Sequence, residues 1–170
     1  HAGVSCWKNH KNLNHKSIGI EIQNSGHSNK YEKFPTKQLR SLLLLSKVLK
    51  KKYKIKNKNF LGHSDIAPTR KKDPGEKFPW DMLAKNEIGL WHYLPKKDAK
   101  LRYDQVTIKE KKLFYLYLEK IGYCFKFKRS GHLKAVITAF QRRYRSEIIN
   151  GKIDKECLEI TKNLIKSGLN

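Results

Sequence analysis

The sequence predicts an α/β domain followed by a small three-helix unit. Residues 17–23 alternate apolar and polar side chains, which is typical of a strand with one buried face. Residues 36–53 repeat leucines at helical spacing, and three more helical segments follow residue 106. We therefore expect a first domain over residues 1–92, a linker over 93–105 and a three-helix domain over 106–170.

The stretch "SIGIEIQ" carries an acid in an otherwise apolar strand pattern. Ile18 and Ile20 would point to one face, whereas Glu21 would point to the other. Glutamate is uncommon in strands, so Glu21 is either an exposed edge residue or a functional acid. A second short strand is expected to end at Gly62.

The leucine-rich segment 36–53 is the clearest helix of the first domain. Thr36 is the candidate N-cap, and lysines at the other end suit the negative pole of the helix dipole. Leu44, Leu45 and Val48 widen the apolar face, so we expect this helix to pack against a sheet.

Capping residues mark the three helices of the second domain. Thr107 and Glu110 form the capping-box pattern "TIKE", and Gly122 would end that helix. Ser130 and Asp154 are the expected N-caps of the next two helices. A unit of about 65 residues lies within the size range that folds alone.

The net charge of +23 arises from 38 basic and 15 acidic residues and would attract polyanions. The lysines are scattered, and no nucleic-acid-binding motif accompanies them, so we expect no specific nucleic-acid partner. No apolar run is long enough for a transmembrane segment.

The three cysteines are odd in number and lack CxxC spacing. They predict neither a disulfide framework nor a cysteine zinc site, although a bond between Cys124 and Cys157 is left open. Cys6 is expected to be an ordinary packing residue.

The loop "GHSDIAPTRKKDPG" contains the residue types of a metal site. Its prolines would bend the chain so that His63 and Asp73 converge, and zinc accepts both as ligands. Lys71 lies two residues before Asp73 and would face the same way, where it could stabilise an oxyanion. Glu21 could act as general base. The alternative for His63 is a polar loop residue without a ligand role.

Three blocks of the first domain, "HAGVSCW", "SIGIEIQNSGH" and "LGHSDIAPTRKKDPGEKFPW", resemble successive blocks of the zinc-dependent N-acetylmuramoyl-L-alanine amidases. This type-2 family includes the peptidoglycan recognition proteins, and the closest branch cleaves muramoyl and 1,6-anhydromuramoyl peptides. The resemblance covers His1 to about Trp91 and implies a mixed central sheet flanked by helices. The segments "AVITAFQRRY" and "NGKIDKECLEIT" resemble the peptidoglycan-binding domain of cell-wall hydrolases.

The resemblance also implies residue roles. His63 and Asp73 match the second and third Zn²⁺ ligands, Lys71 matches the lysine that stabilises the tetrahedral intermediate, and Glu21 matches the base. Three further residues are expected to bind substrate: His1, Ile22 and Arg70. The family's first zinc-ligand histidine lies on a strand upstream of the "HAG" block. We therefore expect the N-terminal strand, and with it the third ligand, to come from a segment before His1 or from another fragment; His1 is an alternative ligand.

The implied reaction is hydrolysis of the amide between N-acetylmuramic acid, or its 1,6-anhydro form, and L-alanine of the stem peptide. The partners would be peptidoglycan or muramoyl peptides. A wall-binding domain favours the periplasm or cell envelope, with the cytoplasm as the alternative. A non-catalytic peptidoglycan binder is the second hypothesis, but the presence of both visible ligands, Glu21 and Lys71 favours an enzyme.

Overall fold

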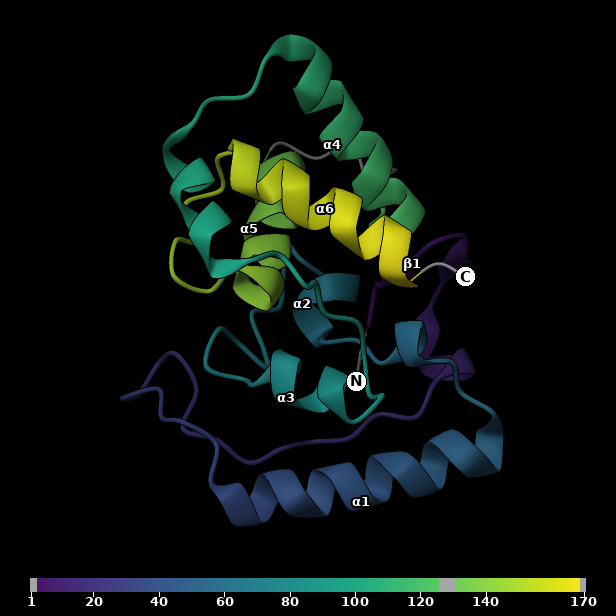
Figure 1. Cartoon of the computed structure of the whole chain (residues 1–170). Helices are drawn as coiled ribbons and strands as arrows, with labels where there is room; N and C mark the ends of the chain where they lie inside the picture. Colours follow the sequence, from purple (N-terminus) through teal and green to yellow (C-terminus); the bar gives the residue numbers. More distant parts are fainter. Residues whose placement is uncertain (1–2, 126–130, 169–170) are drawn as a thin grey trace.

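A computed structural model describes residues 3–125 and 131–168, so the predicted roles of His1 and Ser130 fall outside the described residues. The elements in chain order are β1 (Cys6–Trp7), β2 (His10–Lys11), η1 (Leu13–Lys16), α1 (Thr36–Tyr53), η2 (Asn57–Asn59), α2 (His63–Ile66), α3 (Trp80–Lys85), η3 (Lys96–Tyr103), α4 (Ile108–Ile121), α5 (His132–Tyr144) and α6 (Lys155–Gly168). Figure 1 shows α4, α5 and α6 together at one end and α1 along the opposite side, with α2 and α3 between them.

The sheet of the described residues is a short antiparallel hairpin. β1 pairs with β2 through Cys6 opposite Lys11 and Trp7 opposite His10. The segment 17–25 is extended, as its alternation predicts, but it is not a strand, because no described segment pairs with its backbone. Ile18 therefore remains exposed instead of facing a core.

The second predicted strand, before Gly62, is also absent. Residues 57–59 form the 3-10 helix η2, in which the N–H of Asn59 donates to Lys56 O and that of Phe60 donates to Asn57 O. These local hydrogen bonds use the backbone groups that a strand would offer to a neighbour. The prediction failed because a short apolar run does not distinguish a strand from a compact turn.

Helix α1 spans the predicted residues 36–53, with Pro35 at the N-cap and Thr36 as its first residue. Leu42 and Ser46 are its buried residues. Leu44, Leu45 and Val48 are exposed, so the expectation that they pack against a sheet was wrong. Only part of the apolar stripe of α1 faces the core. The reason is that this helix packs against a cluster built on Phe34, Phe78 and Trp80 and not against a sheet.

The three C-terminal helices form the main core. The predicted capping box at the start of α4 is present, and Gly122 ends that helix. At the start of α6, the Asp154 Oδ1 accepts a hydrogen bond of 2.9 Å from the N–H of Cys157, which confirms its capping role. The side chains that pack between these helices are fully buried: Phe114, Leu118, Val136, Phe140, Leu158 and Leu164.

This core also contains residues from the first domain. Trp7 belongs to the same cluster and meets Tyr123 edge to face, with 5.0 Å between ring centroids. A disulfide joins Cys6 to Cys124, while Cys157 is free and buried in α6. The cysteine prediction was therefore wrong. Packing of Trp7 brings Cys6 to Cys124, a contact between distant segments that cysteine spacing does not reveal.

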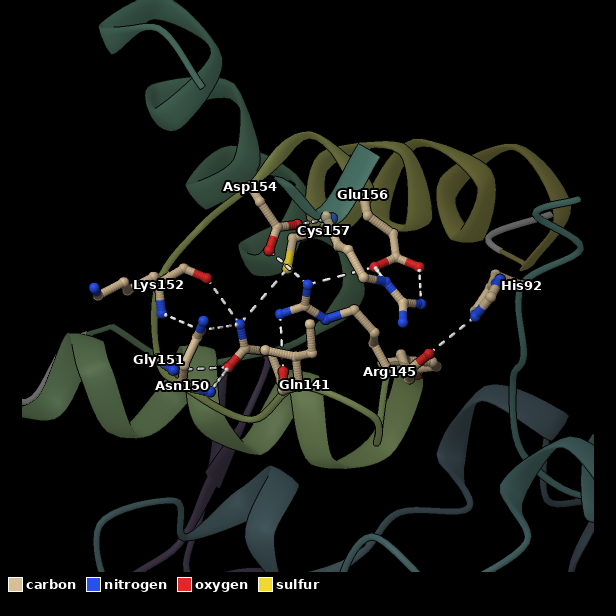
Figure 2. A network of polar contacts seen from close by, with 12 residues as sticks. His92, Gln141, Arg145, Asn150, Gly151, Lys152, Asp154, Glu156 and Cys157 are labelled. Atoms are coloured by element: carbon tan, nitrogen blue, oxygen red, sulfur yellow. Dashed lines mark hydrogen bonds and ion pairs between the residues drawn. The ribbon is translucent and has the colours of Figure 1, made fainter. Parts of the chain in front are cut away.

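Residues predicted to form a linker contain η3, which packs on α6. Arg102 makes two hydrogen bonds to Glu156, of 3.0 and 2.8 Å. Figure 2 shows the adjoining polar network, in which Arg145 reaches Asp154 and Glu156. Gln141 closes the α5–α6 connection by accepting from the N–H groups of residues 150 and 151. Within the two described ranges, no helix has the length and apolar character needed to cross a bilayer.

Candidate active site

His63 and Asp73 lie in direct contact. The Nδ1 atom of His63 is 2.5 Å from Oδ2 of Asp73, so the two residues converge as the sequence predicts. Their side chains are 28% and 54% exposed, so a solute can reach both. His63 is the first residue of α2, and Asp73 lies ten residues further along the proline-containing loop.

The segment 62–76, hereafter the ligand loop, is closed by its own backbone. The N–H of Ser64 donates to Asp73 O over 2.9 Å, which ties the start of α2 to the far end of the loop. A Cβ on Gly62 would lie 2.7 Å from Cδ of Pro74, closer than real Cβ contacts come. A glycine before His63 is therefore what allows the two ends of the loop to approach.

Tyr31 holds the end of the ligand loop. Its hydroxyl donates to Pro74 O over 2.6 Å and accepts from the N–H of Lys77 over 3.1 Å. Gly75 has a φ of +87°, and a Cβ there would collide with that hydroxyl. His27 stacks on Tyr31 and contacts Glu76 through its Nε2 at 2.9 Å. Asp73 is thus followed directly by a braced turn.

Asp65 anchors α2 from its buried side, a role that the sequence analysis missed. Its Oδ2 accepts from the N–H of Gly62 at 2.8 Å and from Nη1 of Arg143 at 2.5 Å, while its Oδ1 accepts from the Tyr123 hydroxyl at 2.7 Å. Burial, reinforced by the charge of Asp65, raises the pKa of Tyr123 well above its ordinary value. For Asp65 the sequence offered one signal, its position two residues after His63. Nothing in the sequence distinguished Arg143 from other basic residues near a helix end.

The other predicted site residues occupy different environments. Glu21 is exposed on the extended segment 17–25, and Ile22 is partly buried against the Phe34 and Phe78 cluster. Lys71 is half-buried. The Nη2 of Arg70 donates to Val4 O over 2.8 Å, so Arg70 lies beside the segment that follows the "HAG" block.

The donor atoms of the His63–Asp73 pair fit a zinc ion. Zinc takes imidazole nitrogen and carboxylate oxygen at about 2.0–2.2 Å, and a catalytic site needs three protein ligands. In the described ranges, no group of three or more His, Cys, Asp or Glu side chains could hold a metal ion. His63 and Asp73 are thus two side chains of the types that zinc accepts, and a catalytic zinc would need a third protein ligand beside them.

Residues 1–76 match the family model of the N-acetylmuramoyl-L-alanine amidases. The chain is 35% identical to N-acetylmuramoyl-L-alanine amidase AmiD of Escherichia coli (strain K12) over 179 aligned positions, which cover 98% of this chain and 63% of AmiD. It is 40% identical over 82 residues to the 1,6-anhydro-N-acetylmuramyl-L-alanine amidase AmpD of Haemophilus influenzae, covering 48% of this chain and 42% of that protein.

Two solved structures resemble the whole chain. A complex of E. coli AmiD with the substrate anhydro-N-acetylmuramic acid-L-Ala-D-γ-Glu-L-Lys matches with a TM-score of 0.83 at 33% identity, covering 100% of this chain and 69% of that one. The crystal structure of AmpDh3 from Pseudomonas aeruginosa gives a TM-score of 0.86 at 31% identity, again covering 100% and 69%.

The fold that carries the His63–Asp73 contact in this chain is thus shared with a structurally characterised amidase. This chain belongs to the N-acetylmuramoyl-L-alanine amidase family. The likeness to AmiD confirms the predicted α/β class. The chain spans less than two thirds of the length of the curated relatives AmiD and AmpD.

Proposed function

We propose that this protein is a zinc-dependent amidase that hydrolyses the bond between N-acetylmuramic acid, or its 1,6-anhydro form, and L-alanine of the peptidoglycan stem peptide. The observation that carries this proposal is the contact between His63 and Asp73 inside the region that matches the amidase family. AmiD, whose solved complex contains an anhydromuramoyl peptide, supports the choice of substrate.

In this proposal His63 and Asp73 hold Zn²⁺, in keeping with the general zinc dependence of the family. When bound, zinc polarises a carbonyl and lowers the pKa of water toward neutrality. A third ligand would be a histidine supplied by a segment N-terminal to the "HAG" block or by another fragment. Both described side chains are accessible from solvent, as ligands at a substrate cleft must be.

The remaining predicted residues would act on substrate and water. Glu21 would take the proton of the attacking water, and the Lys71 ammonium would stabilise the negative charge that develops on the carbonyl oxygen. Arg70, together with His1 and Ile22, would line the substrate cleft. The guanidinium of Arg70 suits a stem-peptide carboxylate, which it can bind through two parallel hydrogen bonds.

The test compares D73A with D81A in the full-length protein. Asp81 is a suitable control because its side chain is 47% exposed, close to the 54% of Asp73, but it pairs with Lys85 on α3. We expect D73A to lose zinc and cleavage of an anhydromuramoyl tripeptide, and D81A to keep both. Wild-type zinc content in D73A would refute the ligand assignment. Binding of the tripeptide without cleavage by the zinc-loaded wild type would instead support a non-catalytic binder.

We also infer that the protein works in the periplasm or cell envelope, the cytoplasm being the alternative. The Cys6–Cys124 disulfide supports this, because such bonds persist in oxidising compartments and are rare in the cytosol. Acid-quenched cells treated with a thiol-alkylating reagent would test it. The inference requires one modified cysteine per molecule before reduction and three afterwards; three before reduction would favour the cytoplasm.

A further inference from the structure

Two neighbouring arginines at the end of α5, Arg142 and Arg143, reach out of the helical region to the ligand loop. In the sequence, Arg142 lies 66 residues after the last residue of that loop, Glu76. Arg143 contacts the start of the loop at Asp65, and Arg142 approaches its end at Glu76. The two contacts connect the C-terminal helices to both ends of the segment that carries His63 and Asp73.

Arg143 holds the chain on both sides of His63. Its Nη1 lies 2.5 Å from Asp65 Oδ2, and its Nη2 donates to Phe60 O over 3.1 Å. The guanidinium also stacks on Trp80, with Cζ 3.9 Å from the ring centroid. Because the donors of Arg143 form a rigid planar fork, residues 60 and 65 are fixed relative to each other and to α5.

Both side chains of the Arg143–Asp65 ion pair are buried. The side chains of Arg143 and Asp65 are 2% and 1% exposed. Burial alone would lower the pKa of Arg143, but the adjacent carboxylate of Asp65 keeps it above its ordinary value, so the guanidinium remains charged. Separating Arg143 from Asp65 would leave each buried side chain without an oppositely charged partner, which favours the arrangement in which α2 lies against α5.

The second arginine acts at the other end of the loop. The Nε of Arg142 lies 3.6 Å from Glu76 Oε2, the same oxygen that His27 contacts at 2.9 Å. Glu76 follows Asp73 by three residues, within the turn that Tyr31 braces. The contact is longer than that of Arg143, so we assign the stronger effect to Arg143.

We propose that Arg143 is a positioning residue of the metal site: by fixing Asp65 and the Phe60 carbonyl, it sets the position of His63, so the C-terminal helical region is part of the catalytic unit. This inference rests on the proposed zinc ligand role of His63. Residues that orient metal ligands from behind typically change metal affinity or activity by about 10- to 100-fold when replaced.

Arg145 provides a matched control, two residues further along. It is also buried, at 2% exposure, and its Nη1 lies 2.5 Å from Asp154 Oδ2. Its Nη2 donates to Ile148 O over 2.9 Å, so these contacts are with the α5–α6 connection and not with the ligand loop. Figure 2 shows Arg145 beside Asp154 and Glu156. R143K and R145K therefore disturb equivalent buried ion pairs, of which one touches the loop.

The experiment measures four properties of R143K and R145K in the full-length protein: melting temperature, zinc dissociation constant by chelator competition, the visible spectrum of the Co²⁺-loaded form, and kcat and KM. We expect both variants to melt at lower temperature. We expect R143K alone to bind zinc about tenfold more weakly, to alter the Co²⁺ spectrum, and to lower kcat more than it raises KM. If both variants lose thermal stability while R143K keeps the wild-type zinc affinity and spectrum, Arg143 is only structural and the proposal fails.

Two further variants keep the test decisive. D65N keeps the size of the side chain but removes the charge that Arg143 contacts, so it replaces R143K if that variant does not fold. A folded D65N with wild-type zinc affinity and Co²⁺ spectrum would then overturn the proposal. H63A distinguishes the proposed ligand role of His63 from the proposed positioning role of Arg143. If H63A retains wild-type zinc affinity, the proposed ligand set is wrong; if H63A loses zinc but R143K does not, only the positioning role is wrong.

Discussion

The disulfide between Cys6 and Cys124 should be a large contributor to stability. It joins residues separated by 118 positions. In the chain-entropy model a closed loop of that length lowers the free energy of folding by about 5 kcal/mol at 25 °C, an upper value because measured effects are commonly 2–4 kcal/mol. Replacing both cysteines by alanine removes this constraint from the unfolded chain.

The assay is urea unfolding followed by tryptophan fluorescence. With a urea m-value of about 2 kcal/mol/M, a loss of 2–5 kcal/mol lowers the midpoint by roughly 1–2.5 M. The m-value should also rise, because an unfolded chain without the cross-link exposes more surface.

Reducing agent provides the control for this prediction. It should destabilise the wild type to the level of C6A/C124A and leave the midpoint of the double variant unchanged, since Cys157 is the thiol that remains. Equal midpoints for oxidised and fully reduced wild type would refute the reasoning, and would mean that packing around Trp7 holds the two segments together without the bond.

Three further predictions follow from buried contacts. Phe140→Ala should lower the free energy of unfolding by about 3–5 kcal/mol, because it opens a cavity in a fully buried site; a loss below 1 kcal/mol in chemical denaturation would contradict this. Burial lowers the pKa of His92, whose Nε2 lies 2.9 Å from Tyr144 O. The free energy of unfolding should therefore fall as the pH drops below about 6.5, because the unfolded chain gains a proton there that the folded chain does not. His92→Gln should flatten this pH dependence. Gly62→Ala should weaken zinc binding, measured by chelator competition, because its Cβ would push Pro74 away; unchanged affinity would show that the loop can relax.

Local signals in the sequence predicted the long helices well, but not the short helices α2 and α3. Residues 36–53 form α1, and the capping box of Thr107 and Glu110 starts α4, because caps and helical periodicity depend on residues only three or four positions apart. The contact between His63 and Asp73 could also be predicted, since Pro68 between them and Pro74 directly after Asp73 limit the conformations of the loop. The roles of Glu21, Lys71 and Arg70 stay predictions.

What could not be predicted depends on distant partners. Alternation in residues 17–23 indicates which side chains share a face, but a strand forms only where a neighbour accepts its backbone hydrogen bonds. The Cys6–Cys124 bond and the Asp65–Arg143 pair join residues separated by 118 and 78 positions, and no local pattern signals either. For the same reason, the sequence did not reveal that α5 contacts the ligand loop.

The buried pair of Asp65 and Arg143 also sets an order of events during synthesis. The ligand loop leaves the ribosome first, and a nascent chain that ends before residue 143 lacks the cation that Asp65 contacts. His63 and Asp73 are then already present, but the support behind them is not. With the positioning role proposed for Arg143, the candidate metal site would be completed late in translation, once the helical region has been made and has folded against the loop.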